Sequence, residues 1–408
     1  MNLAKSGGAA LLSAALLGMW GCSSDTRQSV GSGASPLVRP AAMSDTVQAA
    51  AEPSMQAEGV AGPKAPPAAP AKEGEANGPS AYGGSRPAAY TGDELFEIGT
   101  TDSWWGLMNQ KGETVAEPKY RLSFPSTDGI SLVNPVPGSG LEPAALINAG
   151  GKVIASGFDF SGEISEGLVY VKKATKQVFL DYEGQTVLDL GRLPADARVG
   201  GFHDGLAKID SGSEHYYIDR SGKTVLQTSY AQAGDFSEGL AYVPGEGFLD
   251  KSGNLAIVQK DYVKAYPFKE GLAKIEYPDR TYSYIDKSGT VLTERRFTRA
   301  TGFSSGLAGV SEGEGFRYIH PNGENAGTVV WEDGREYSEG LAAVKQGGKW
   351  GYIDPKGQLV IEAKYEEAFP FRNGLAVVYT GTDSGQDTLY IDREGKVVRP
   401  KLEGSPSS

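Results

Sequence analysis

The sequence has little cysteine and little histidine, which narrows the chemistry open to it. Its 408 residues include one cysteine, Cys22, and three histidines, His203, His215 and His320. A single cysteine cannot form an internal disulfide or supply a multi-thiolate metal site, and no two histidines have the spacing of a zinc motif such as HExxH. We therefore expect no bound metal, no cofactor and no Cys/His nucleophile.

Positive charge is also scarce. Lys and Arg number 39 against 51 Asp and Glu, so the formal net charge is −12. Nucleic-acid binding needs clustered basic residues to neutralise phosphates, and this balance argues against it. It also disfavours electrostatic docking onto anionic lipid. No phosphate-binding loop or dinucleotide fingerprint is present. Nucleic acid is therefore not an expected partner.

Long hydrophobic runs are missing except in residues 1–21. There a lysine precedes an apolar run of about a dozen residues, too short to span a bilayer but of the length of a signal-peptide core. The run ends at Gly21-Cys22-Ser23, with Met19 and Trp20 before it. This resembles a bacterial lipoprotein signal, in which the cysteine is lipidated and becomes the new N-terminus. An ordinary secretory signal with an incidental cysteine is the alternative.

The lipoprotein resemblance implies palmitate on Cys22 and attachment to a membrane. Because Ser23 rather than Asp follows the cysteine, it implies the outer membrane if the source is Gram-negative. Residues 22–90 hold nine of the chain's 23 prolines with much Ala, Gly and Ser. Such a composition cannot bury enough apolar area to fold, which predicts a disordered tether, and residues 403–408 are expected to be a disordered tail.

Residues 91–402 repeat one pattern at steps of 32 to 38 residues. Gly-Leu followed by Ala or Val begins at Gly167, Gly205, Gly239, Gly271, Gly306, Gly340 and Gly374. A second motif, such as Tyr352-Ile-Asp-Pro-Lys-Gly357, keeps pace with the first. Self-similarity at this period indicates a repeat architecture.

Each unit is predicted to be an antiparallel meander. Asp354 and Gly357 suit a tight turn between strands, because Asp can bond the N–H groups ahead of it and Gly takes positive φ. In Leu-Ala-x-Val, both faces of the strand are apolar, which predicts sheets covered on both faces. We expect an all-β fold of about eight antiparallel units of three or four strands. A β-propeller whose termini complete one shared blade is favoured, with an open β-solenoid as the alternative.

The segment from Lys349 to Val378 resembles the bacterial WG repeat, whose core is similar to KWGYIDxxGxxVIxxxYxxxxxFxxGLAxV. The resemblance extends over roughly Thr91 to Pro400, although most copies have lost the Trp-Gly pair. WG repeats are generally taken as interaction modules, so the resemblance implies a fold more than an activity.

Recurring polar residues raise two alternatives. The aspartates of the second motif could bind calcium, but each turn offers one carboxylate, whereas calcium needs six to eight oxygens. They are interpreted as turn residues: Asp181, Asp219, Asp250, Asp286, Asp354 and Asp392. Trp104, Trp105, Trp331 and Trp350 could stack on sugars, but large aromatics in repeats more often fill the space between sheets.

The meander predicts two different rims. The Asp-x-x-Gly turns and the Gly-Leu connections share a nearly uniform rim, whereas the loops on the other rim differ in every unit. Loops on a rigid scaffold usually carry recognition, so we expect contacts from Tyr277, Arg280, Tyr282 and Asp383. The leading hypothesis is a non-enzymatic, lipid-anchored binding or scaffold module for a protein or glycan of the cell envelope. The alternative is a carbohydrate-active hydrolase or lyase.

Overall fold

The computed structural model describes residues 94–99, 104–123, 128–135, 144–191, 193–194, 196–382 and 385–400. All regular elements in these ranges are β-strands. Among them there is no helix with the length and apolar character needed to cross a membrane. The predicted signal peptide (1–21), tether (22–90) and tail (403–408) lie outside the described residues, as do Cys22 and Asp383.

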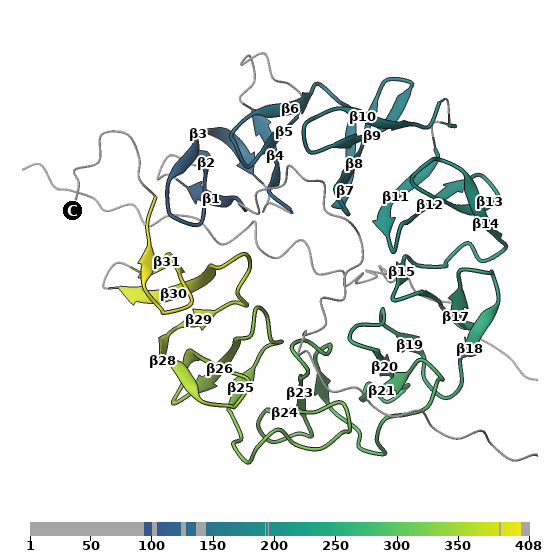
Figure 1. The fold of residues 1–408 in the computed structure, drawn as a ribbon. Helices are drawn as coiled ribbons and strands as arrows, with labels where there is room; N and C mark the ends of the chain where they lie inside the picture. Colours follow the sequence, from purple (N-terminus) through teal and green to yellow (C-terminus); the bar gives the residue numbers. More distant parts are fainter. Residues whose placement is uncertain are drawn as a thin grey trace, which may run out of the picture. The chain divides into compact units, whose positions relative to one another are not determined.

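The strands form consecutive antiparallel units, which we number I to IX, and strand order within each sheet follows chain order (Figure 1). Unit I contains β1 (Phe96–Gly99), β2 (Trp105–Met108) and the start of β3 (Thr114–Ser123), and unit II contains the end of β3, β4 (Ile130–Pro135), β5 (Ala145–Asn148) and β6 (Val153–Ser156). Unit III contains β7 (Phe160–Ser165), β8 (Leu168–Lys173), β9 (Lys176–Asp181) and β10 (Thr186–Asp189). Unit IV contains β11 (Arg198–His203), β12 (Leu206–Ser211), β13 (Glu214–Ile218) and β14 (Thr224–Thr228).

The remaining units continue the pattern. Unit V contains β15 (Phe236–Ser237), β16 (Leu240–Val243), β17 (Gly247–Asp250) and β18 (Leu255–Val258). Units VI and VII have three strands each: β19 (Lys264–Ala265), β20 (Leu272–Glu276), β21 (Tyr282–Asp286), and β22 (Arg299–Ala300), β23 (Ala308–Ser311), β24 (Arg317–Ile319). Unit VIII contains β25 (Asp333–Gly334), β26 (Ala342–Gln346), β27 (Lys349–Ile353) and β28 (Leu359–Tyr365). Unit IX contains β29 (Glu367–Ala368), β30 (Ala376–Thr382), β31 (Gly385–Ile391) and β32 (Val397–Val398).

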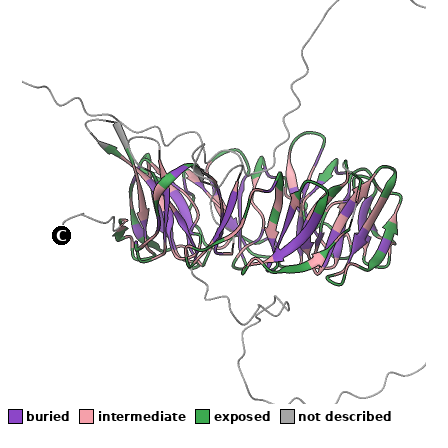
Figure 2. Cartoon of the chain, turned by 90° about the horizontal axis from the view of Figure 1, so that it is seen from above, coloured by how far each residue is buried: buried purple, intermediate pink, exposed green. Residues whose placement is uncertain are grey.

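The units are arranged as a β-propeller (Figures 1 and 2), and in units III, IV and V the first strand is innermost (Figure 1). The described residues contain nine buried apolar clusters, one at each contact between neighbouring units. One of them joins Phe96 and Met108 of unit I to Leu375 of unit IX, with the Phe96 and Tyr390 rings 5.5 Å apart. The ring is therefore closed by packing, which confirms the propeller and excludes the open solenoid.

Two details of the predicted ring are wrong. About eight units were expected, seven from the Gly-Leu pairs and one from the degenerate Asp128-Gly129-Ile130. The described residues form nine when the six-stranded sheet β1–β6 is divided into units I and II, because Glu94-Leu95 of unit I stands where other units have Gly-Leu. The termini were expected to share one blade. Instead, β32 supplies the fourth strand of unit IX, whereas β1 to β3 pair with one another and β3 continues into unit II by pairing with β4. First and last units meet face to face, without strand exchange among the described residues.

Both faces of the Leu-Ala-x-Val strand are buried, as predicted. In β26 and the residue before it, Leu341 and Ala343 belong to the cluster shared with unit IX, whereas Ala342 and Val344 belong to the cluster shared with unit VII. Alternate residues of a strand point to opposite faces, so this one strand contributes to two interfaces. The blade is too thin to have a core of its own, and its stability depends on both neighbours.

The Asp-x-x-Gly motif forms a turn, as predicted. Asp354 Oδ1 accepts the backbone N–H groups of Lys356 and Gln358, each at 2.9 Å. The other five aspartates make the same pair of bonds, and Asn109 and Asn148 make them in the degenerate copies. One carboxylate oxygen of each motif is thus used for turn closure, in line with the turn interpretation rather than calcium binding.

The glycine of Trp-Gly allows a close approach between strands. Opposite Gly351, strand β28 bulges: Trp350 pairs with Tyr365 and Tyr352 with Ile361, so that three residues of β28 face the single Gly351. A Cβ on Gly351 would lie 2.5 Å from the Ile361 carbonyl oxygen and 2.7 Å from the Ala363 nitrogen. Both obstructing atoms are backbone, so no side-chain rotation relieves the clash.

We expect Gly351→Ala to destabilise the protein by about 1–3 kcal/mol, because the outer strand must shift away. Denaturant unfolding of the full chain measures this cost. The control is Gly348→Ala, where φ is +76° and nothing lies within 4 Å of the added Cβ. Its cost should be only the conformational one, about 1 kcal/mol. Equal effects of the two substitutions would contradict the close-approach explanation.

The Gly-Leu rim carries hydrogen bonds that join neighbouring units, which we call the rim bonds. The residue before Gly-Leu has positive φ. Where this residue is Asp or Glu, its carboxylate accepts hydrogen bonds from backbone N–H groups at the Gly-Leu connection of the next unit. Glu339 accepts from the N–H groups of Asn373 and of Gly374, the latter at 2.9 Å. Its backbone oxygen also accepts from Arg393 at 2.7 Å. Equivalent carboxylate bonds are made by Glu166, Asp204, Glu238 and Glu270.

Replacement of Glu339 by Gln should destabilise the protein by about 1–2 kcal/mol, because two N–H groups lose a charged acceptor. The thermal midpoint of the full chain is the measurement. Ser305 occupies the same place in unit VII, with φ +57° and no carboxylate. Ser305→Ala should therefore stay within about 0.5 kcal/mol. A loss for Ser305→Ala as large as that for Glu339→Gln would show that the carboxylate is not the cause.

Candidate functional site

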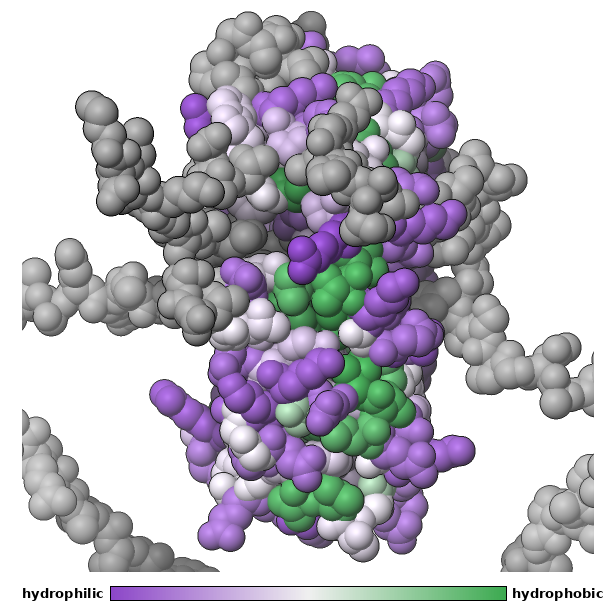
Figure 3. All heavy atoms as spheres, turned by 90° about the vertical axis from the view of Figure 1, so that its left-hand side faces the viewer, coloured by the Kyte–Doolittle hydropathy of each residue, from purple (hydrophilic) through white to green (hydrophobic). Residues whose placement is uncertain are grey.

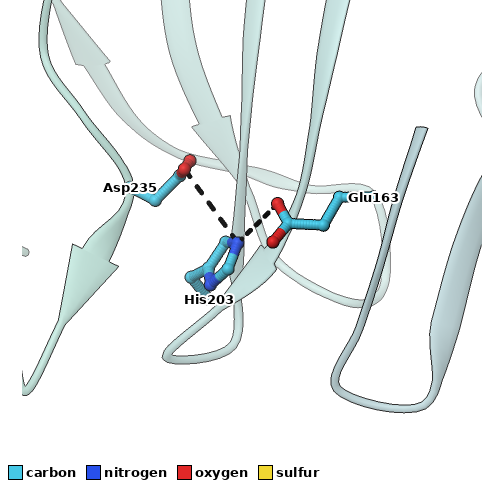
Figure 4. Close-up of side chains that lie close together, drawn as sticks. All are labelled: Glu163, His203 and Asp235. Carbon is cyan, nitrogen blue, oxygen red and sulfur yellow. Dashed lines mark hydrogen bonds and ion pairs between the residues drawn. The ribbon is translucent and has the colours of Figure 1, made fainter. Parts of the chain in front are cut away.

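Three ionisable side chains meet at the inner strands of units III, IV and V. Glu163 lies in β7, His203 ends β11, and Asp235 directly precedes β15 (Figure 4). We call these residues the channel cluster, because β7, β11 and β15 are the innermost strands of their units (Figure 1). The local sequence around each residue does not predict this contact, because Glu163 and His203 are 40 positions apart in the chain.

Backbone irregularities position two of the three side chains. The pairing of β7 with β8 shifts register between Ser161 and Ile164, and that of β11 with β12 shifts between Val199 and Phe202. Such bulges bend an inner strand and re-aim a side chain. Glu163 lies within the first bulge, and His203 follows the second.

The imidazole of His203 lies between the two carboxylates (Figure 4). Its Nε2 is 3.0 Å from Glu163 Oε2 and 4.0 Å from Asp235 Oδ2. The hydrogen bond to Glu163 raises the pKa of His203 above its ordinary value, while burial opposes this. Burial raises the pKa of the Asp235 carboxyl, and the nearby imidazole opposes that rise. One potential ligand atom from each residue lies within 4.8 Å of the others.

The residues predicted to bind a partner lie elsewhere. Arg280 is exposed at the tip of the β20–β21 loop, with φ +64°. Tyr277 is only 7% exposed, and the Arg296 guanidinium lies 3.7 Å from its ring centroid. Tyr282 is half-buried beneath Lys274, whose Nζ is 5.3 Å from the ring. Asp383 lies outside the described residues.

Tyr277 lines a pocket of about 290 Å³ between units V and VI. Its other walls include Val258, Tyr262 and Val291. Unit VI has no fourth strand, and only isolated bridges continue its sheet outward, which leaves this space against β18. The Tyr262 hydroxyl is buried and has no hydrogen-bond partner in the described part of the chain. A ligand with a polar atom there would satisfy it.

The outer strands expose aliphatic residues. Figure 3 shows apolar patches separated by polar side chains on the side of the ring. Exposed valines recur near the same turn of successive units: Val153, Val187, Val225, Val258, Val291, Val360 and Val397. In contrast, Trp331 and Trp350 are 7% and 4% exposed and belong to the clusters between units. For these two tryptophans, packing rather than sugar stacking is what the structure shows.

Comparison with protein families identifies the repeat. A model described as the WG containing repeat matches residues 105–134, 217–243, 247–277, 282–315, 316–350 and 350–381. The chain contains WG repeats. The six matches leave residues 135–216 uncovered, so the WG pattern is weakest through unit III and most of unit IV. Glu163 and His203 lie in this stretch, and the spacing of the histidines along the sequence gave no sign of their contact.

One of the other comparisons, with a solved structure at a TM-score of 0.51, supports the fold, and none supports an activity. No curated protein matches the WG-repeat chain. A structure titled as a eukaryotic initiation factor is similar at a TM-score of 0.51, with 11% identity over 75% of this chain and 95% of that one. BamB from Moraxella catarrhalis has a TM-score of 0.35, with 14% identity over 73% of this chain and 98% of that one. These identities are too low to transfer an activity.

Proposed function

We propose that the protein is a lipid-anchored, non-enzymatic binding module of the cell envelope. The observation that carries this proposal is the difference between the two rims. The Gly-Leu rim uses its carboxylates for the rim bonds between units, whereas the opposite rim carries loops of differing length and charge. A rigid ring with one variable rim suits recognition better than turnover. The partner is an envelope protein or a glycan.

The β20–β21 loop is the part of the variable rim best suited to contact a partner. Asp279 and Arg280 are exposed at its tip, and Tyr277 at its base lines the pocket between units V and VI. Aromatic walls and a few polar groups are typical of ligand sites. The alternative of a glycosidase is less well supported, because the His203 imidazole occupies the space between the Glu163 and Asp235 carboxylates where a sugar would bind.

Two experiments test the proposal. Replacing Cys22 with Ser should release the protein from membranes, and labelled palmitate should enter the wild-type chain in its native host; absence of label contradicts the anchor.

For binding, a glycan array and envelope extracts are probed with the full chain and with Arg280→Ala. The control is Lys356→Ala on the Asp-x-x-Gly rim, an exposed turn residue. Loss on the control alone would assign binding to the other rim.

A further inference from the structure

The channel cluster departs from the repeat in a way that opens space. Glu163 and Asp235 occupy one repeat position, the residue before the large apolar residue of the inner strand, in units III and V. Unit IV has Gly201 at that position. A Cβ on Gly201 would lie 2.5 Å from Ser165 Oγ and 3.1 Å from Glu163 Oε2. The glycine therefore leaves room for the carboxylate of one unit to reach the histidine of the next.

We propose that Glu163, His203 and Asp235 bind a divalent transition-metal cation of the Zn²⁺ class and so join units III, IV and V. The three ligand atoms lie within 4.8 Å of one another, compatible with metal–ligand bonds of about 2.0–2.2 Å after small rotations. Two carboxylates with one imidazole suit Zn²⁺, Co²⁺ or Mn²⁺ better than Ca²⁺, which prefers an all-oxygen set. This departs from the expectation of no metal, which considered only spacing along the sequence.

A second observation at the same place indicates an additional ligand. Ser165 is 9% exposed, and its Oγ is buried with no hydrogen-bond partner among the described residues. Its counterparts are satisfied, since Ser237 and Ser338 donate to the Phe268 and Phe371 carbonyls at 2.6 and 2.5 Å. A metal-bound water within reach of Ser165 Oγ would give this hydroxyl a hydrogen-bond partner and complete four-coordination.

The other side of the ring provides an internal comparison. There Lys269 Nζ lies 2.6 Å from Glu336 Oε1, joining units VI and VIII across Gly302 of unit VII. An ammonium neutralises that carboxylate and has no lone pair for a metal. In the channel cluster, two carboxylates face one imidazole, so at least one negative charge is unbalanced. Lys208 is close by, but it is bonded to Asp210 and to the Ala231 carbonyl.

The test uses the full chain, stripped with a chelator and titrated with ZnCl₂ and CoCl₂. We expect one ion per chain and a rise of several degrees in thermal midpoint at saturation. His203→Gln should weaken binding at least tenfold. The matched control is His215→Gln: His215 Nδ1 is 2.8 Å from Asp210 Oδ1, but within the part of the chain that the structure describes no second carboxylate joins this pair in a possible ligand cluster. This control should bind the ion as the wild type does.

Three outcomes would overturn the proposal. The first is that a folded His203→Gln variant binds the ion with the same affinity as the wild type. The second is that Zn²⁺, Co²⁺ and Mn²⁺ at millimolar concentration do not stabilise the wild type. The third is a thiolate charge-transfer band in the Co²⁺ spectrum, which would assign the ion to Cys22. If His203→Gln does not fold, Asp235→Asn replaces it, since the Asp235 side chain is 49% exposed. Wild-type affinity in that variant would equally overturn the site.

Discussion

Tyr352→Ala should lower the stability of the full chain by about 3–5 kcal/mol, the usual cost of removing a fully buried aromatic side chain. Tyr352 has no exposed surface, and its ring centroid lies 4.9 Å from that of Phe371 in the next unit. Its hydroxyl donates to the Phe369 carbonyl at 2.8 Å. The substitution therefore removes both apolar contact and a hydrogen bond at one interface of the ring.

Two further variants separate these contributions. Tyr352→Phe keeps the ring and should cost about 1–2 kcal/mol, because the Phe369 carbonyl loses its donor. Phe160→Ala removes an aromatic ring that is 54% exposed and should cost less than about 1 kcal/mol. Guanidinium unfolding followed by tyrosine fluorescence and circular dichroism measures all three. A cost for Tyr352→Ala no larger than that for Phe160→Ala would contradict the interface explanation.

The hydroxyl bond of Tyr352 recurs around the ring, which makes this result general. Tyrosines at the same place donate to a carbonyl 17 residues later, where the chain has entered the inner strand of the next unit: Tyr217 to Gly234, Tyr284 to Thr301 and Tyr318 to Arg335. Each bond fixes the chain as it passes from one blade to the next. The third strand of a blade thus positions the first strand of its successor.

The second large effect concerns ring closure and depends on pH. Glu97 lies in β1, and burial raises the pKa of its carboxyl from 4.5 to about 7, with Arg372 of unit IX opposing the rise. Its Oε1 is buried and has no hydrogen-bond partner within the described segments. Between pH 4.5 and 7 the folded protein holds a proton that the unfolded chain has lost. Stability therefore falls as pH rises through this window.

Glu97→Gln should remove this loss. At pH 8 the variant should be more stable than the wild type by up to about 3 kcal/mol, and at pH 4.5 the two should differ little. Urea unfolding at both pH values is the measurement. Glu117→Gln, at an exposed position of β3, is the control and should leave the pH dependence unchanged. The explanation is contradicted if Glu97→Gln and wild type lose stability in parallel across the window.

The residues within each repeat were sufficient to predict its local structure. Asp354 and Gly357 predict their turn because the conformation depends on backbone bonds within five residues. Leu341 to Val344 predict a strand buried on both faces because alternation is a property of the strand itself. The similarity of the units predicted a closed propeller with two rims. In equal antiparallel units, the loops at equivalent positions lie on the same side of the ring.

Only the tertiary structure decided the number of units, the way in which the first and last units close the ring, and the channel cluster. Unit I was not counted because Glu94-Leu95 replaces its Gly-Leu pair, and it is recognised as a separate blade by its packing against Leu375 of the neighbouring unit IX. Glu163, His203 and Asp235 belong to three different repeats, and Gly201 makes their contact possible by having no side chain. A pattern along one chain describes what equal positions share. It does not predict the contacts between side chains that depart from the repeat and that the ring brings together from different units.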